Sequence, residues 1–502
     1  MHVHRRQFLQ AASQGAAAVA LAPLLSSNSW AASIAGDPFA KLDAVAQAQA
    51  IATGDATATE VLNAAIRRIE ALNPRINAVV ANDFQRARSR AQENHFSGAF
   101  AGVPFLIKDL DDFAGVRTTY GTRSMLENIS KADEPYVAAC VATGVNVVGK
   151  SNTPEFGLTG TTESLALGPC YNPWNLTRSS GGSSGGAGAA VAAGMVPMAQ
   201  GSDGGGSIRI PASCCGVFGL KPSRGRLMGS NDEFEFSVNG ALSRTVRDTA
   251  YLLAHTEREK PSPGLNPIGL VTGPNKRRLT IGMYLKGASG QEPSSDVTSA
   301  ILATARLCEE LGHEVRISRI DFSGSQMAED FLTLWASSAG DAVERLENER
   351  GRKATLQDFE PLTLAFAAQH HGGGKEKIPV AAERLKALAK NVADQMEPYD
   401  LLLGPVLSTA PPRIGEYAPT VPFEELMTRM IAYVAYTPVF NVTGMPAMSV
   451  PLTWNEQGLP IGSQFAAKSG DERTLLELAY ELEAARPWAD KWAPCSAGAS
   501  SA

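Results

Sequence analysis

The sequence has little of several features that mark common classes of protein. Its 6 cysteines form no Cys-x-x-Cys pair of the metal-binding kind, so we expect thiols that fill the core and no bridge between the adjacent Cys214 and Cys215. Lys and Arg number 45 against 51 Asp and Glu, without lysine clusters, which argues against a nucleic-acid partner. No run beyond the N-terminal region reaches about 18 apolar residues, so we expect no membrane span in the mature protein.

The N-terminal 35 residues differ in composition from the rest of the chain. The pair Arg5-Arg6 is followed by Phe8-Leu9 and an alanine-rich, weakly apolar stretch, and small-x-Ala cleavage candidates end at Ala31 and Ala35. This pattern resembles a bacterial twin-arginine export signal, the alternative being a basic N-terminal helix. We therefore predict a signal peptide at residues 1–35 and a mature protein that is periplasmic or secreted. Its removal takes away two arginines and no acidic residue, so the formal charge changes from −6 to about −8.

Helix-like and strand-like segments alternate along the remaining chain. Thr57-x-x-Glu60 is a capping box that predicts a helix to about Leu72, closed by Asn73-Pro74. The apolar run 103–107 predicts a buried strand that ends at Lys108. Further strand-like segments occur at 146–148, 196–199, 279–285, 314–317 and 401–406. The alternation predicts one large α/β domain at residues 36–490, with a mixed, mostly parallel central sheet covered by helices on both faces, and a disordered tail at 491–502.

The most informative segment lies between residues 179 and 209, where two serines are framed by glycines. Ser183 stands in Gly-Gly-Ser-Ser-Gly-Gly, and Ser207 stands in Asp-Gly-Gly-Gly-Ser-Ile-Arg. Glycine is costly inside regular elements, so this density indicates backbone that turns sharply or approaches a ligand. Consecutive glycines before a serine leave N–H groups free to point at one spot, as an oxyanion requires.

A serine nucleophile needs a base within hydrogen-bond reach, and the histidines lie far from this segment in sequence. A neutral lysine can serve, although lowering a lysine pKa from about 10.4 to about 7.4 costs ~4 kcal/mol. Lys108 is the candidate because it ends a buried strand, where open α/β sheets carry their chemistry. Taken alone, Lys108 would more often be a solvated lysine, as is expected for Lys150, and Ser183 a turn serine. The coincidence of Lys108, Ser183 and Ser207 is what indicates a site.

Several motifs together resemble the amidase signature family, the serine hydrolases with a Ser–cisSer–Lys triad. The matching segments are 102–108 (Gly-Val-Pro-Phe-x-x-Lys), 149–155 (Gly-Lys-Ser-Asn-Thr-Pro-Glu), 172–174, 181–186, 201–209, 441–447 and 458–464. The resemblance extends from about residue 40 to about residue 490. Segments 203–212 and 219–226 are most similar to the branch that contains cyclic nylon-oligomer hydrolase and related amidases.

The resemblance implies a function and a role for each of three side chains. Ser207 would be the nucleophile that forms an acyl-enzyme, Ser183 the bridging serine after a cis peptide bond from Gly182, and Lys108 the base at the end of the relay. Neutral Lys108 would draw a proton through Ser183 while Ser207 attacks the amide carbonyl, and the same relay would protonate the departing amine. The expected activity is thus hydrolysis of a carbon–nitrogen amide bond.

The resemblance also implies supporting roles around this triad. The expected oxyanion donors are the N–H groups of Gly204, Gly205, Gly206 and Ser207. Gly157 matches a position whose backbone borders the substrate in relatives, and Ser184 is expected to support Lys108 by a hydrogen bond. Asp203 and Arg209 are expected to form a structural ion pair.

Other classes of protein fit parts of the same segment. Gly182-x-Ser184-x-Gly186 matches the nucleophile elbow of an α/β-hydrolase esterase with His313 or His370 downstream, but that elbow needs a preceding strand and residues 176–180 are not strand-like. A secreted, non-catalytic solute-binding protein would use the glycines to hold an anion. A transamidating subunit acting on aminoacyl-tRNA shares the triad, but the export signal and acidic composition argue against it. The adjacent His370 and His371 are interpreted as a surface loop and not as metal ligands.

The substrate is inferred only as a class. The branch implies a small neutral aliphatic or aryl amide, or a carbamate, with no metal or organic cofactor. The region 321–397 is mostly helical in pattern and is predicted to line or cover the acyl pocket, through Phe331, Leu332, Trp335 and Phe366.

Overall fold

The computed structural model describes residues 34, 36–229, 235–288, 290–322 and 324–499. Apart from Ile34, the predicted signal peptide at 1–35 lies outside the described residues. None of the helices in the described part combines the length and apolar composition needed to cross a lipid bilayer.

The N-terminal half supplies the elements that surround the glycine–serine segment. In chain order they are α3 (Ala44–Thr53), α4 (Ala58–Ile76), β1 (Val79–Asn82), α5 (Phe84–Glu93), β2 (Pro104–Lys108), η1 (Arg123–Met125), α6 (Pro135–Ala142), β3 (Asn146–Ser151), η2 (Glu155–Gly157), β4 (Glu163–Ser164), β5 (Gly168–Pro169), β6 (Tyr171–Asn172), β7 (Asn175–Ser179), α7 (Gly185–Ala192), β8 (Met198–Asp203), α8 (Arg209–Cys215), β9 (Phe218–Lys221), β10 (Val238–Ser243) and α9 (Val246–Thr256).

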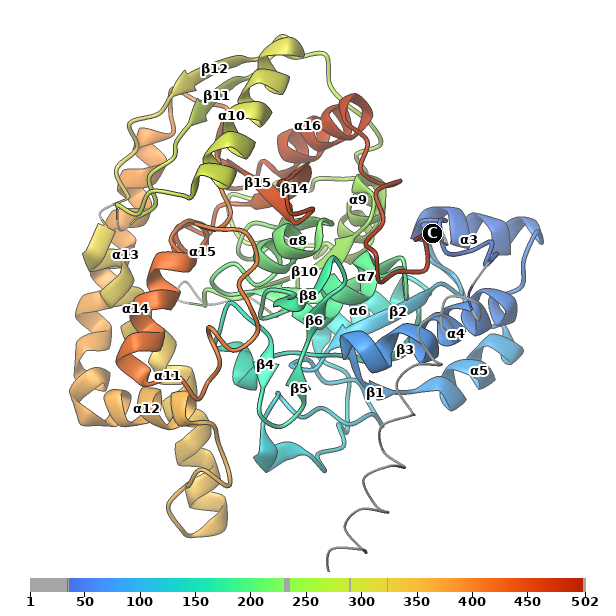
Figure 1. Cartoon of the computed structure of the whole chain (residues 1–502), viewed down its shortest axis with the longest axis horizontal. Coiled ribbons are helices and arrows are strands. Elements are labelled where there is room, and N and C mark those ends of the chain that lie inside the picture. Colours follow the sequence, from blue (N-terminus) through green and yellow to red (C-terminus); the bar gives the residue numbers. More distant parts are fainter. Residues whose placement is uncertain (1–33, 35, 230–234, 289, 323, 500–502) are drawn as a thin grey trace, which may run out of the picture.

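The C-terminal half completes the sheet and adds a group of helices beside it. Its elements are β11 (Thr280–Met283), α10 (Ser295–Glu310), β12 (Glu314–Ile317), α11 (Gly324–Arg350), α12 (Pro361–Gln369), the π-helical turn η3 (His370–Gly374), α13 (Lys375–Gln395), β13 (Leu401–Pro405), α14 (Phe423–Tyr433), α15 (Pro438–Val442), β14 (Ala447–Trp454), β15 (Pro460–Ala467) and α16 (Glu472–Ala485). Helices α11, α12, α13 and α14 gather on the left of Figure 1, whereas α3, α4 and α5 lie on the right.

An 11-stranded mixed sheet runs through the domain in the order β1-β3-β2-β8-β10-β9-β14-β15-β13-β11-β12. The predicted single α/β domain with a mixed, helix-covered sheet is confirmed. The expected parallel majority is wrong, because β2 pairs in parallel with β3 and β8, and β11 with β12 and β13, while the other neighbours are antiparallel. Strands such as β14 and β15 are joined by turns too short for a crossover helix, and this forces them to pair antiparallel.

Helix α4 begins as its sequence predicts and ends later. Thr57 and Glu60 make the reciprocal capping-box bonds. The helix continues through Pro74 to Ile76, and its C-cap Asn77 has φ of 55° and donates its N–H to the Asn73 carbonyl. A proline near the end of a helix removes one backbone hydrogen bond, and the fully buried Ile76 keeps the last turn packed against the domain. The predicted end at Asn73-Pro74 is therefore wrong by one turn.

Small residues allow helix α7 to lie close to the sheet. All eight of its residues are buried, and Ala187, Ala190 and Val191 share a core cluster with Leu106 of β2 and Ala199 of β8. The helix therefore carries the residues before its N-terminus to the carboxyl ends of β2 and β8. This arrangement brings segments distant in sequence to one point.

The C-terminal segment is packed, and not disordered as predicted, through residue 499. Ala493 and Cys495 are buried, Ala497 donates its N–H to the Ala193 carbonyl at 2.9 Å, and Arg244 lies 3.7 Å over the Trp492 ring. The Ser/Ala composition concealed these anchoring side chains.

The predicted helical region 321–397 is confirmed as α11, α12 and α13. The expected surface loop at His370-His371 is wrong, because both residues belong to η3 and His370 is buried. His370 packs on α11, where a Cβ at Gly340 would lie 2.5 Å from its ring. All six cysteines are free and buried, as expected for core-filling thiols.

Candidate active site

Lys108 and Ser183 are brought together at the carboxyl end of β2. Lys108 has no exposed surface, and its Nζ lies 2.7 Å from Ser183 Oγ. The same Nζ contacts Ser202, with 3.1 Å to Oγ and 3.5 Å to the backbone oxygen. The lysine is therefore held between Ser183, two residues before α7, and Ser202 near the end of β8, as its position at a strand end predicts.

The surroundings of Lys108 favour its neutral form. Burial lowers the pKa of its ammonium group to about 8, against the opposing attraction of Asp111 and Asp203. A lysine with such a pKa is neutral in about one molecule in ten at pH 7, far more often than a lysine in solvent, and the neutral amine can accept a proton from a neighbouring hydroxyl.

The backbone around Ser183 has the expected cis peptide bond from Gly182. A Cβ at Gly182 would lie 2.6 Å from the Thr161 carbonyl oxygen, so this position requires glycine. Gly157, with φ of 70°, presents its backbone to the same serine, because a Cβ there would lie 3.0 Å from Ser183 Oγ. Gly157 therefore borders the site, where the sequence placed it.

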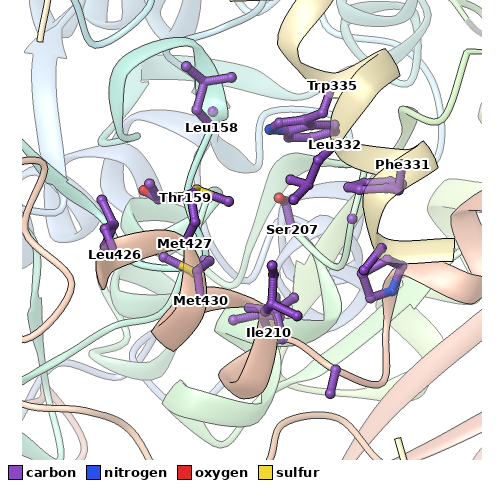
Figure 2. A pocket seen from close by; sticks show the side chains of 18 of the residues that line it. Leu158, Thr159, Ser207, Ile210, Phe331, Leu332, Trp335, Leu426, Met427 and Met430 are labelled. Carbon is purple, nitrogen blue, oxygen red and sulfur yellow. The ribbon is translucent and has the colours of Figure 1, made fainter. Parts of the chain in front are cut away.

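Ser207 lies just before the N-terminus of α8 and faces a pocket (Figure 2). It is 7% exposed, and its backbone oxygen accepts the N–H of Ser184 at 3.2 Å. Within the described part of the chain its hydroxyl makes no hydrogen bond, so the link from Ser183 to Ser207 is open in this structure. The structure thus brings all three predicted residues to one region and makes the lysine link of the expected relay.

The loop before Ser207 is fixed by an ion pair. Arg209 contacts Asp203 at 2.9 Å, as predicted, with both side chains fully buried. Burial opposes ionisation of Asp203, but the adjacent guanidinium outweighs it and holds the pKa of this carboxyl well below its usual range. Thr437 adds a hydrogen bond of 2.7 Å to the Gly205 oxygen. The loop is therefore held from both sides.

The same carboxylate changes the expected set of oxyanion donors. The Gly206 N–H donates to Asp203 Oδ1 at 2.7 Å and is already engaged, which the sequence did not indicate. The N–H groups of Gly204, Gly205 and Ser207 meet no acceptor among the described residues. Three of the four expected donors therefore stay available to a ligand.

Ser184 was expected to support Lys108 by a hydrogen bond, but its hydroxyl contacts Ser202 instead. Its Oγ donates to the Ser202 backbone oxygen at 3.2 Å and accepts the Ser202 N–H at 3.3 Å, so it braces the end of β8. Ser202 is the serine that reaches the lysine amine. Its place between Gly201 and Asp203, at the end of a strand parallel to β2, was the available signal.

A buried polar network behind Lys108 was also missed. Gln200 accepts the Lys108 backbone N–H at 2.7 Å and donates to Asp111 at 3.0 Å. Lys150, expected in solvent, is fully buried and donates to the Asp111 backbone oxygen at 2.5 Å and to Thr118 Oγ1 at 2.7 Å. Its position on β3, beside β2 in the sheet, explains the difference.

An apolar pocket opens in front of Ser207 and encloses about 860 Å³ of space, part of it open to solvent. Its walls include Gly157, Leu158 and Thr159, residues of α11 and α12, and Met427 and Met430 of α14 (Figure 2). The predicted Phe331, Leu332, Trp335 and Phe366 all line it. None of its described lining residues carries a charge, so the pocket suits an uncharged ligand.

The aromatic rings of α11 lie against the glycines that precede Ser207. Phe331 and Trp335 stack with centroids 5.2 Å apart. A Cβ at Gly204 would lie 2.9 Å from the Trp335 ring, and one at Gly205 would lie 3.3 Å from the Phe331 ring. The absence of side chains at these glycines thus lets the aromatic wall approach the backbone N–H groups.

The esterase alternative lacks its base. Residues 175–179 do form strand β7, so the sequence argument against an elbow was wrong on that point. The positions of the two candidate histidines exclude this alternative instead. His313 Nε2 lies 3.0 Å from Glu481, and His370 packs on α11. Neither contacts Ser184. The part of the chain that is described also holds no group of three or more His, Cys, Asp or Glu residues arranged to bind a metal.

Comparisons with known proteins agree with this architecture. The family model described as Amidase matches residues 60–476. The chain is 41% identical over 457 residues to the predicted amidase AmiC of Mycobacterium leprae (strain TN), covering 90% of this chain and 97% of the relative. It is 36% identical over 470 residues to the 6-aminohexanoate-cyclic-dimer hydrolase of Pseudomonas sp. (strain NK87), covering 89% and 95%.

The fold is also similar to that of solved amidase structures. A 6-aminohexanoate cyclic dimer hydrolase complexed with substrate superposes with a TM-score of 0.85 at 33% identity, covering 91% of this chain and 99% of that one. The fold and the match define an amide-cleaving hydrolase. The chain belongs to the amidase family, as the sequence motifs implied.

Proposed function

We propose that the protein hydrolyses a small neutral amide through an acyl-enzyme on Ser207. Neutral Lys108 takes a proton from Ser183, and Ser183 takes one from Ser207 as its oxygen attacks the carbonyl carbon. The carbon–nitrogen bond then breaks while the relay returns a proton to the nitrogen, and water hydrolyses the ester. The N–H groups of Gly204, Gly205 and Ser207 stabilise the oxyanion.

The observation that supports this proposal most directly is the 2.7 Å contact between the buried Lys108 Nζ and Ser183 Oγ. An unpaired lysine buried without function would be costly, whereas a neutral lysine is the base that a serine requires in the absence of histidine.

Mutation of the two candidate serines tests the nucleophile. Ser207→Ala should abolish labelling by a fluorophosphonate and reduce anilide turnover by several orders of magnitude. Ser184→Ala should retain labelling, because its hydroxyl only braces Ser202. Labelling lost with Ser184→Ala alone would favour the esterase elbow. A wild-type protein that takes up no label would favour a solute-binding role.

The uncharged pocket supports a neutral aliphatic or aryl amide, or a carbamate, as the substrate class. One relative of this chain is named as a cyclic-dimer hydrolase, which extends the panel to cyclic amides. Turnover of anilides, short amides, cyclic amides and carbamates by the purified protein will rank these classes. A preference for substrates with a charged acyl group would contradict the assignment.

We also propose that residues 1–35 direct twin-arginine export to the periplasm or beyond. The support is the sequence pattern around Arg5-Arg6. Replacing both arginines by lysine should retain the protein in the cytoplasmic fraction, with the unaltered chain as the control. Equal distribution of the two forms would overturn the proposal.

A further inference from the structure

A buried glutamate joins the loop beside Ser183 to helix α12. Glu155 is 1% exposed, and its Oε2 accepts the backbone N–H of Glu360 at 2.8 Å and the hydroxyl of Thr363. These groups belong to the first turn of α12, where N–H groups lack intrahelical partners. A carboxylate from η2 therefore caps α12, since the side chain at the N-cap, Glu360, makes no cap bond of its own.

Both ends of this contact lead to the pocket. Glu155 is followed by Phe156 and by Gly157, whose backbone borders Ser183. Helix α12 supplies Leu362 and Phe366 to the pocket wall. The position of α12 relative to the Gly157 loop therefore determines the space between that loop and this wall.

The residue that donates its N–H to Glu155 carries a second buried carboxyl group. Glu360 is 4% exposed, and its Oε1 accepts the N–H of Leu165 at 2.7 Å. Burial raises the pKa of both carboxyls, and repulsion from Glu155 helps to raise that of Glu360 to about 8. The charged group that faces both is Arg123, whose guanidinium is engaged with the Leu356 oxygen.

We propose that Glu155 is a positioning residue of the amidase: it fixes the Leu362–Phe366 wall against the Gly157 loop, and the nearby buried carboxyl of Glu360 makes this wall sensitive to pH. This inference rests on the proposed assignment of the Ser207 pocket as the substrate site. While one of the two carboxyls holds a proton, Glu155 keeps its bonds to the Glu360 N–H and the Thr363 hydroxyl. When both carboxyls ionise, like charges repel in a site with little solvent, and the wall separates from the loop.

The signature is a change in KM that depends on substrate length. Between pH 7 and 9, the wild-type KM for a long-acyl anilide should rise by about tenfold, whereas the KM for acetanilide, which does not reach α12, should stay within about twofold. Lys108 also loses its proton between pH 7 and 9. This loss changes kcat for both substrates, so it cannot produce a KM change that is limited to the long-acyl anilide.

Two substitutions separate the contact from its charge. Glu155→Ala removes the cap and should hold the long-acyl KM at every pH at about ten times the wild-type value at pH 7, with acetanilide little changed. Glu155→Gln keeps an oxygen that accepts from Glu360 and Thr363 but removes the charge, and it should abolish the pH-dependent rise in KM. The matched control is Glu163→Gln, since Glu163 is also a buried carboxyl and caps the Gly415 N–H at 2.7 Å without lining the pocket.

The outcomes are distinct from those of the acyl-enzyme test. Equal loss with both substrates in Glu155→Ala overturns the positioning role, and a wild-type KM that is flat with pH overturns the pH sensitivity, while fluorophosphonate labelling of Ser207 continues in either case. If Glu155→Ala does not fold, the pH profile of Glu155→Gln decides alone. A profile of Glu155→Gln that rises like the wild type also overturns it.

Discussion

At the scale of single residues, burial of Lys108 lowers stability in return for a reactive group. An unfolded lysine has a pKa of about 10.4, and the folded pKa is about 8. Folding therefore opposes its charge, and the penalty is absent above the unfolded pKa and complete below the folded pKa. At neutral pH the whole penalty is present.

Lys108→Met should accordingly remove activity while stabilising the fold. At pH 7 the free energy of unfolding should rise by up to about 3 kcal/mol, less the cost of leaving the hydroxyls of Ser183 and Ser202 without the amine. Urea unfolding at pH 7 and pH 10 measures this, and the gain should shrink at the higher pH. A variant that keeps most of its turnover would refute Lys108 as the base.

The pH dependence of turnover should follow the same lysine. Because activity requires the neutral amine, kcat/KM should increase as pH rises through about 8. Asp111 favours the charged amine, so Asp111→Asn should move this acidic limb to lower pH, measured with acetanilide. The adjacent Asp112→Asn is the control. An unmoved limb in Asp111→Asn would show that this carboxylate does not tune the base.

At the scale of elements, the site depends on how closely α7 approaches the sheet and its neighbouring loops. A Cβ at Gly186 would lie 2.2 Å from the Asn152 nitrogen and 2.6 Å from the Ala78 oxygen. Backbone atoms cannot yield as a flexible side chain does, so the start of α7 would have to move. Ser183 lies two residues before the start of that helix and would move with it.

Gly186→Ala should therefore reduce stability by about 1–3 kcal/mol and slow acylation. Gly372→Ala is a matched control, because nothing lies within 4 Å of its added methyl group. Denaturant unfolding and the rate of fluorophosphonate labelling measure the two effects. Equal behaviour of the two variants would contradict the close packing of α7.

The sequence could predict the elements that carry the site, and it missed the contacts between them. The capping box at Thr57, the strand ending at Lys108 and the helical region 321–397 depend on local patterns, which a sequence displays. Ser202, Gln200 and the buried Lys150 depend on which strands become neighbours in the sheet. Gly206 was counted as a free donor because its engagement with Asp203 is a property of the folded loop. Sheet order is a long-range outcome that composition does not encode.

At the scale of the whole molecule, the last described residues pack against the rest of the domain. Trp488 is buried and donates to the Arg244 oxygen at 2.8 Å, and Cys495 donates its N–H to the Pro173 oxygen at 3.2 Å. This segment crosses the C-terminal end of α7, where Trp492 packs on Gly194. The segment therefore supports α7 at its C-terminal end, opposite to the end that follows Ser183.

Truncation after Asp490 should lower the melting temperature by about 1 °C for each kcal/mol of packing energy removed, because a domain of this size has a large entropy of unfolding. Removal of the buried Ala493 and Cys495 and of the Arg244–Trp492 interaction gives the reason. Thermal unfolding of the truncated and full chains measures it, and truncation at 499 is the control. An unchanged melting temperature after truncation at 490 would indicate that this packing contributes nothing.

The pocket walls have one chemical liability. Met327, Met427 and Met430 present thioethers to the space in front of Ser207. Peroxide converts a thioether to a sulfoxide, which is polar and strongly hydrated. Oxidative stress would thus weaken retention of apolar substrates without altering any group that handles protons, and a methionine sulfoxide reductase would restore it.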